Sequence, residues 1–112
     1  MDDFARNGFK TIGIDVFEGD PVPEDALESG KFDIPAWLQR HDPSVAQVLV
    51  EKVIAALKES GVTSFGTTSY CYGSRIAFNL AFMGLASATA VTHPSLLKIP
   101  EDLEVCLLLS VL

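Results

Sequence analysis

The fold is decided by one stretch near the middle of the chain, Gly66-Thr67-Thr68-Ser69-Tyr70-Cys71-Tyr72-Gly73-Ser74-Arg75. It links a β-branched run over residues 62–68, typical of a strand, to an apolar run over residues 74–83, typical of a helix. A reactive side chain, that of Cys71, lies in the middle of the short connection. A strand, a tight turn and a helix in this order are typical of a nucleophile elbow, whose central residue adopts a strained backbone conformation.

Such a turn would place Cys71 at the start of a helix, where backbone N–H groups and the positive end of the helix dipole favour a thiolate. The turn needs small residues two positions before and two positions after the nucleophile, and Ser69 and Gly73 occupy those positions. The amide of Tyr72 would be able to donate a hydrogen bond to an oxyanion. The pattern therefore predicts Cys71 as a catalytic nucleophile and Tyr72 as an oxyanion-hole residue.

The segments on either side of this stretch alternate between helix and strand. Asp42-Pro43 starts the clearest helix and Ser60-Gly61 ends it, and its apolar residues recur at helical spacing: Val45, Val48, Leu49, Val53, Ile54 and Leu57. A helix is also expected over residues 2–7, and strands are expected over residues 11–17, 86–92 and 105–112. A proline-rich, acidic stretch over residues 18–42 predicts a surface loop or a lid. The order predicts an α/β fold, a parallel sheet with helices on both faces.

The chain has 112 residues, of which 48% are hydrophobic, so we expect one domain with a buried core. It opens inside the helix at residues 2–7 and closes inside the apolar strand at residues 105–112. We therefore expect residues 1–112 to be an incomplete piece of a larger α/β domain, with unpaired sheet edges.

The composition excludes several classes of function. A formal net charge of −7 argues against nucleic acid and anionic membranes as partners, because phosphates would be repelled. The longest apolar stretch, residues 76–92, falls short of the roughly 20 residues that span a bilayer. Cys71 and Cys106 lack the spacing of a disulfide framework or a zinc site, so no metal is expected. With no secretory signal at the start, a reducing cytoplasm is the expected location.

The elbow resembles that of the dienelactone hydrolase family, an α/β-hydrolase branch with the pattern G-x-C-x-G and aromatic residues beside the cysteine. Ser69 stands where the family has its first glycine. The resemblance to fungal members extends over nearly the whole chain, through Phe4-Ala5-Arg6-Asn7-Gly8, Asp15-Val16-Phe17-Glu18-Gly19-Asp20-Pro21, Trp37 near His41-Asp42-Pro43, and His93-Pro94-Ser95.

This resemblance implies a hydrolase of small esters or lactones that works through an acyl-enzyme on Cys71 and needs no cofactor. The family takes its triad aspartate from beyond the strand that corresponds to residues 105–112, and its histidine from further on. It takes the second oxyanion donor from a strand that would precede Met1. We therefore expect the isolated chain to be inactive.

Three further side chains are candidates for the substrate pocket: Tyr70, His93 and Arg75. His93 follows a strand at the edge where ligands bind to parallel sheets, and it is a weaker candidate for a substitute general base. Arg75 would contact an anionic substrate group or, alternatively, form a salt bridge. Trp37 is expected to anchor its loop, and His41 to lie at the surface.

Two alternatives to a hydrolase stay open. A shortened product without catalytic power could bind a partner, and the missing triad residues favour this function for the isolated chain. The class I glutamine amidotransferases also place a cysteine in a G-x-C-x-G elbow. They usually have glutamine where this chain has Arg75, which argues against them.

Overall fold

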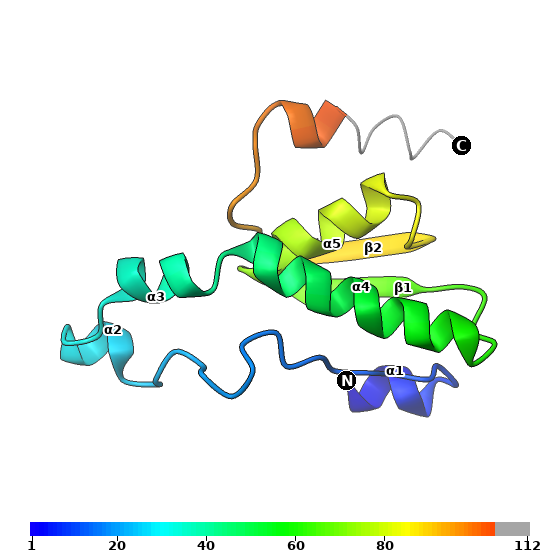
Figure 1. Ribbon diagram of the computed structural model, residues 1–112, viewed down its shortest axis with the longest axis horizontal. Coiled ribbons are helices and arrows are strands. Elements are labelled where there is room, and N and C mark those ends of the chain that lie inside the picture. Colours follow the sequence, from blue (N-terminus) through cyan, green and yellow to red (C-terminus); the bar gives the residue numbers. More distant parts are fainter. Residues whose placement is uncertain (105–112) are drawn as a thin grey trace. The chain divides into compact units, whose positions relative to one another are not determined.

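The computed structural model describes residues 1–104 and divides the chain into two compact units, Met1–Asp42 and Pro43–Leu112 (Figure 1). The second unit carries the sheet and the elbow, and the first consists of short helices and turns. The strand expected over residues 105–112, which includes Cys106, lies outside the described residues.

A βαβ arrangement forms the centre of the second unit. Strand β1 (Gly66–Tyr70) is followed by helix α5 (Gly73–Phe82) and strand β2 (Ala88–Thr92). The two strands pair in parallel, in a register that runs from Gly66 opposite Ala88 to Tyr70 opposite Thr92. The predicted α/β class and the parallel pairing are therefore confirmed for this part of the chain.

Helix α4 (Pro43–Glu59) begins at the predicted proline and packs against α5. Its buried face is shifted from the expected one: Ile54 is buried as expected, and Leu49, Val53 and Leu57 are half-buried. Val45 and Val48 are 59% and 53% exposed. The buried apolar side chains of α4 recur every four residues, and with those of α5 they form the core: Ala46, Val50, Ile54, Ile76, Ala77, Phe78 and Leu80. Val45 and Val48 lie on the face of α4 opposite to the buried one. The apolar positions in the sequence therefore covered a wider face of the helix than the one that is buried.

The strands differ from their predicted bounds, because pairing decides where a strand begins and ends. Residues 62–65 precede the first paired residue, while pairing continues to Tyr70, two residues beyond the expected end. Helix α5 contacts both strands, yet no residue of either strand is fully buried. Coverage of the second face of the sheet stays a prediction.

The first unit contains three short helices, α1 (Asp2–Arg6), α2 (Ala26–Ser29) and α3 (Ile34–Arg40). The strand expected over residues 11–17 is wrong, because this segment leads into a turn. The carboxylate of Asp15 accepts hydrogen bonds from the N–H groups of Phe17 at 3.0 Å and Gly19 at 2.8 Å. These bonds to a local side chain stabilise the turn, and residues 11–17 pair with no neighbouring strand in the described part of the chain.

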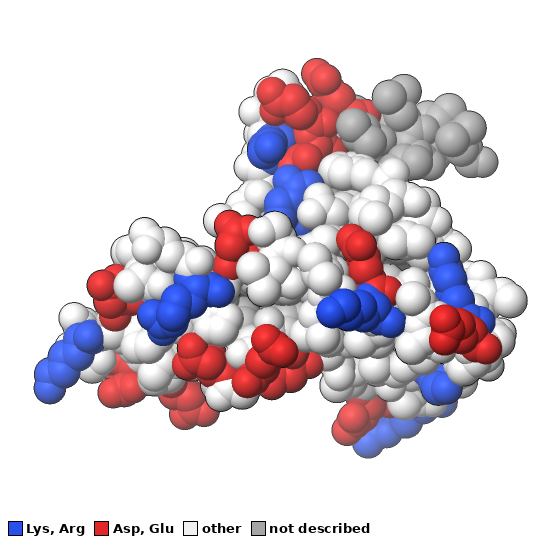
Figure 2. All heavy atoms as spheres, viewed as in Figure 1, with Lys and Arg blue, Asp and Glu red and all other residues white. Residues whose placement is uncertain are grey.

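Acidic and basic side chains are interspersed on the face of the molecule that Figure 2 shows. Acidic residues are in excess over the whole chain, with fifteen against eight lysines and arginines. Within residues 1–104, none of the helices has the length and the apolar composition that crossing a membrane requires.

Candidate active site

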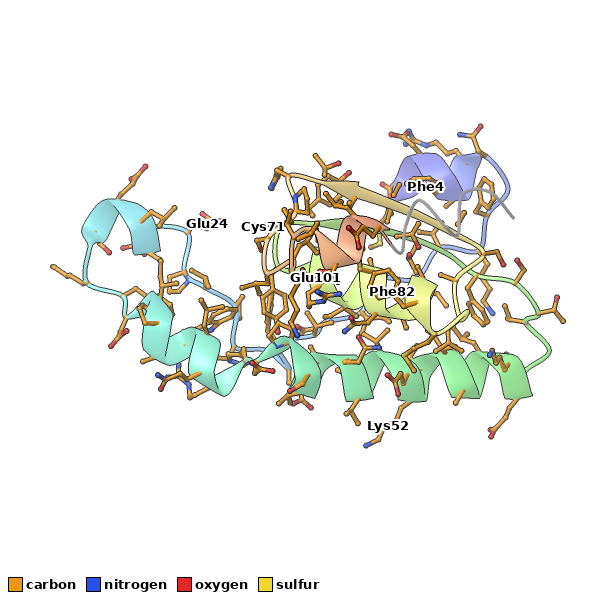
Figure 3. The ribbon with its side chains drawn as sticks, turned by 90° about the horizontal axis from the view of Figure 1, so that it is seen from above. Phe4, Glu24, Lys52, Cys71, Phe82 and Glu101 are labelled. Atoms are coloured by element: carbon orange, nitrogen blue, oxygen red, sulfur yellow. The ribbon has the colours of Figure 1, made fainter. Side chains whose placement is uncertain are left out.

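Cys71 occupies the turn between β1 and α5, at the end of the sheet where both strands finish (Figure 3). Its φ angle is +45°, in the left-handed region that non-glycine residues rarely adopt. Its N–H extends the sheet by donating to the carbonyl of Thr92 at 3.2 Å, and its carbonyl accepts from the N–H of Ser74 at 3.0 Å. One strained residue thus joins the strand to the helix, which is the backbone geometry that the sequence predicted.

The small residues on either side of the turn are in close contact. A Cβ atom added at Gly73 would lie 3.2 Å from the Cβ of Ser69, which is tighter than an ordinary contact. Serine is therefore tolerated at the first small position because the second is glycine. Tyr72, between Cys71 and Gly73, has helical angles of φ −50° and ψ −45°, so its amide belongs to the N-terminus of α5.

Cys71 is exposed, and the hydrogen-bond partner of its sulfur is a residue to which the sequence analysis gave no site role. The Sγ atom lies 3.7 Å from the Oγ of Ser95, and the N–H of Ser95 donates to the Cys71 carbonyl at 3.3 Å. Ser95 follows the end of β2 by three residues, and this position at the carboxyl edge of the sheet was the signal available in the sequence.

Tyr70 and His93 lie beside each other next to the elbow, with ring centroids 6.3 Å apart. Tyr70 ends β1 and is 64% exposed, whereas His93 follows β2 with a φ angle of +36°. Both rings therefore lie at the edge of the sheet where Cys71 is found. Among the described residues, no hydrogen bond joins His93 to Cys71.

Arg75 is engaged by Asp102, in agreement with the salt-bridge alternative. Its Nη1 and Nη2 atoms lie 2.5 and 3.1 Å from the two carboxylate oxygens, and its Nε donates to Asn79 at 3.1 Å. The hydrogen bond from Arg75 holds the pKa of Asp102 below its usual value. A second bond to this carboxylate comes from the Lys98 amide. An open cavity of about 340 Å³ adjoins this group, lined by Arg75, Asn79, Phe82, Lys98 and Asp102.

A second polar cluster lies in the first unit, around the tryptophan. Trp37 is 3% exposed and packs against the rings of Phe17 and His41, with centroids 4.9 and 4.6 Å away. The Trp37 indole donates to the backbone carbonyl of Asp20 at 2.9 Å, and the His41 Nε2 lies 2.8 Å from the Asp20 carboxylate. Trp37 is thus the expected anchor, but the expected surface position of His41 is wrong, because its side chain is only 17% exposed.

Within the described residues, no group of three or more histidine, cysteine, aspartate or glutamate side chains is arranged to hold a metal ion. The elbow offers a different set of groups: an exposed thiol, a hydroxyl beside it and backbone amides at a helix N-terminus. This set is suited to attack on an electrophilic carbon.

Comparison with known proteins identifies relatives of nearly the whole chain. Residues 1–107 match the dienelactone hydrolase family. The chain is 35% identical to "Dienlactone hydrolase 1" of Gibberella moniliformis, over 85% of this chain and 39% of that protein. It is 34% identical to "Hydrolase pyvD" of Aspergillus violaceofuscus, over 90% of this chain and 40% of that protein.

The chain therefore spans about 40% of the length of these curated relatives. No solved structure shows a significant match to it. The family match covers far more than half of the chain, and the resemblance noted in the sequence is confirmed. The chain belongs to the dienelactone hydrolase family.

Proposed function

We propose that the protein is a thiol-dependent hydrolase of small esters or lactones, with Cys71 as its nucleophile. The observation that carries this proposal is the elbow itself, because Cys71 has a φ angle of +45° between a strand and a helix and is an exposed residue. Structural cysteines are usually buried and inert, whereas Cys71 is exposed at the N-terminus of a helix. Family membership and the names of the relatives support the same reaction class.

In the proposed reaction, the Cys71 thiolate attacks the carbonyl carbon of the substrate and forms a C–S bond. The resulting oxyanion would accept a hydrogen bond from the amide of Tyr72. Collapse of the intermediate breaks the C–O bond to the leaving group, which takes up a proton as it becomes an alcohol. Water then attacks the thioester, and the carboxylic acid is released as the thiol is restored.

We further propose that residues 1–112 act within a larger domain, whose other residues cover the exposed face of the sheet and supply a general base. The relatives' length and the exposure of both strands support this proposal. A positioned base contributes about 10²- to 10⁴-fold to the rate of such reactions. The 112-residue chain by itself should therefore react at Cys71 but hydrolyse p-nitrophenyl acetate or a lactone no faster than a simple thiol does.

The test uses the chain with p-nitrophenyl acetate, and mass spectrometry to locate the acetyl group. We expect a thioester on Cys71, slow turnover, and loss of the adduct in Cys71→Ala. The variants Cys71→Ser and His93→Ala are assayed in parallel. His93→Ala tests His93 as a substitute base. A chain that acquires no acetyl group on Cys71 would contradict the nucleophile assignment. Rapid turnover that disappears in His93→Ala would instead make His93 the general base of this chain.

A further inference from the structure

The segment that follows β2 returns to the elbow and is attached there. His93 and Leu96 have φ angles of +36° and +60°, so the chain turns sharply on both sides of Ser95. The Ser95 N–H donates to the Cys71 carbonyl at 3.3 Å, while the Ser95 Oγ lies 3.7 Å from the Cys71 Sγ. Two separate contacts, one of the backbone and one of the side chain, therefore connect Ser95 to Cys71.

The other end of the same segment is attached to α5. The amide of Lys98 donates to the Asp102 carboxylate, and that carboxylate binds the Arg75 guanidinium through both oxygens. Asp102 is 7% exposed, and its pair with Arg75 fixes the segment beside the open cavity described above. Because α5 begins directly after the elbow, the helix that presents Cys71 also holds the segment that carries Ser95.

We propose that Ser95 is a positioning residue for the Cys71 thiol. A hydroxyl can both accept and donate a hydrogen bond, so Ser95 accepts from the thiol in the resting state and donates to the thiolate once the proton has left. Hydrogen bonds to a charged partner are the stronger ones, so the contact favours the ionised sulfur. The same contact restricts the rotation of the Sγ atom. This inference rests on the proposed role of Cys71 as nucleophile and deepens it.

The titratable and charged groups of the elements around the elbow must be separated from the effect of Ser95. The titratable side chains of Tyr70 and His93 come from the ends of the two strands, and Arg75 comes from α5 but is paired with Asp102. A substitution at Ser95 leaves all three of these side chains in the chain. A shift in reactivity that appears in Ser95→Ala and is reversed in Ser95→Thr is therefore assigned to the hydroxyl.

The test measures the alkylation of Cys71 by iodoacetamide, in which the thiolate forms a C–S bond and iodide leaves. Rates are followed by peptide mass spectrometry on the full chain across about pH 5 to 10, the range in which protein thiols ionise. We expect Ser95→Ala to move the midpoint of the rate curve to higher pH and to slow the reaction at neutral pH roughly three- to tenfold, as for loss of one hydrogen bond. The rate at high pH should change little. Ser95→Thr, which keeps the hydroxyl, should restore the wild-type midpoint.

Ser87→Ala is the matched control, because Ser87 lies beside the start of β2, and its hydroxyl forms a similar hydrogen bond with Ser64 at 3.3 Å. It should leave the alkylation curve unchanged. An unchanged midpoint in Ser95→Ala, or an equal shift in Ser87→Ala, would overturn the assignment. A purely structural role for Ser95 would lower the unfolding midpoint without moving the pH curve, and this result would also overturn it.

Acetylation by p-nitrophenyl acetate separates this inference from the proposed function. If Cys71 is acetylated while Ser95→Ala keeps the wild-type alkylation curve, the nucleophile stands and the role of Ser95 is wrong. If the curve shifts as expected but no ester acylates Cys71, the hydrolase function fails, and the role of Ser95 in that reaction is withdrawn with it.

Discussion

Cys71 shows how a single residue can hold a strained conformation and a reactive group together. A left-handed conformation costs a non-glycine residue on the order of 1–3 kcal/mol, and the surrounding structure must offset that cost. Here the offset comes from three backbone hydrogen bonds, to the carbonyl of Thr92 and from the amides of Ser74 and Ser95.

The contact between Ser69 and Gly73 provides a test of the turn at the level of single atoms. A methyl group at Gly73 would meet the Ser69 Cβ at 3.2 Å, so Gly73→Ala should destabilise the chain more when Ser69 is present than when it is glycine. We expect a coupling of about 1 kcal/mol between Gly73→Ala and Ser69→Gly, measured by urea unfolding of the four chains.

The gain in helix propensity from glycine to alanine is the same in both backgrounds, so it cancels in this comparison. Additive effects of the two substitutions, within about 0.5 kcal/mol, would show that the residues do not touch in the folded chain.

At the scale of the elements, α4 has one buried stripe and one exposed row of valines. Ile54 is 7% exposed and packs in the core, whereas Val48 is 53% exposed on the same helix. Ile54→Ala should cost about 2–4 kcal/mol of unfolding free energy, and Val48→Ala should change it by less than about 0.5 kcal/mol. Urea unfolding followed by circular dichroism provides the measurement, and equal costs at the two positions would contradict the assigned face.

The pair of Arg75 and Asp102 joins α5 to the segment after β2. Asp102→Asn leaves a half-buried guanidinium without its counter-charge, so we expect a loss on the order of 1–3 kcal/mol at neutral pH, as for hydrogen bonds to a charged group. The hydrogen bond from Arg75 lowers the pKa of Asp102 in the folded chain. The ion pair therefore contributes fully to the unfolding free energy at pH values above the usual pKa range of aspartate. That contribution disappears as the pH falls through the lower, folded value.

The difference in stability between wild type and Asp102→Asn should therefore be constant near neutral pH and shrink in acid below about pH 4. Glu101→Gln is the control, since Glu101 is the exposed neighbour of Asp102 and should have little effect. A pH-independent difference, or an equal loss in Glu101→Gln, would show that the pair does not hold this segment.

At the scale of the whole molecule, the chain consists of two units with different means of stabilisation. The second has a helical core on a parallel sheet, and the first depends on a small aromatic cluster around Trp37. A hydrogen bond between His41, at the end of α3, and Asp20 connects α3 to the segment before α2. This hydrogen bond lowers the pKa of Asp20. Stability of the first unit should thus be linked to the charge of Asp20.

Trp37 is the single tryptophan of the chain, so its fluorescence reports on this unit selectively. Asp20→Asn should lower the urea midpoint read by Trp37 emission at neutral pH. Because the pKa of folded Asp20 is lowered, the gap from wild type should close as the pH falls below about 4 and wild type also loses the charge. The Asp20 side chain is 56% exposed, so the effect should be modest and should weaken in high salt.

Asp25→Asn serves as the control in the same unit, because Asp25 is exposed and precedes α2. A midpoint that moves as far in Asp25→Asn as in Asp20→Asn would assign the effect to net charge rather than to the contact with His41.

Local sequence was sufficient for the elements whose signals lie within a few residues. Pro43 and the glycine at position 61 bound α4, and the run from Ser69 to Gly73 predicted the elbow, because turn and cap chemistry acts over short distances. The family resemblance could be read from the same residues. Helix α5 begins within one residue of its predicted start for the same reason.

Only the tertiary structure decided the features that depend on distant partners. β1 ends at Tyr70 because Thr92 pairs with it, whereas residues 11–17 pair with no strand of the described chain and lead into a turn that the Asp15 carboxylate bonds. Ser95 reaches the sulfur of Cys71 from 24 positions away, through a chain reversal that no local pattern encodes. The order of residues determined the position of the reactive thiol in the chain. Long-range pairing determined which side chains surround it, because contacts between distant residues exist only after the chain has folded.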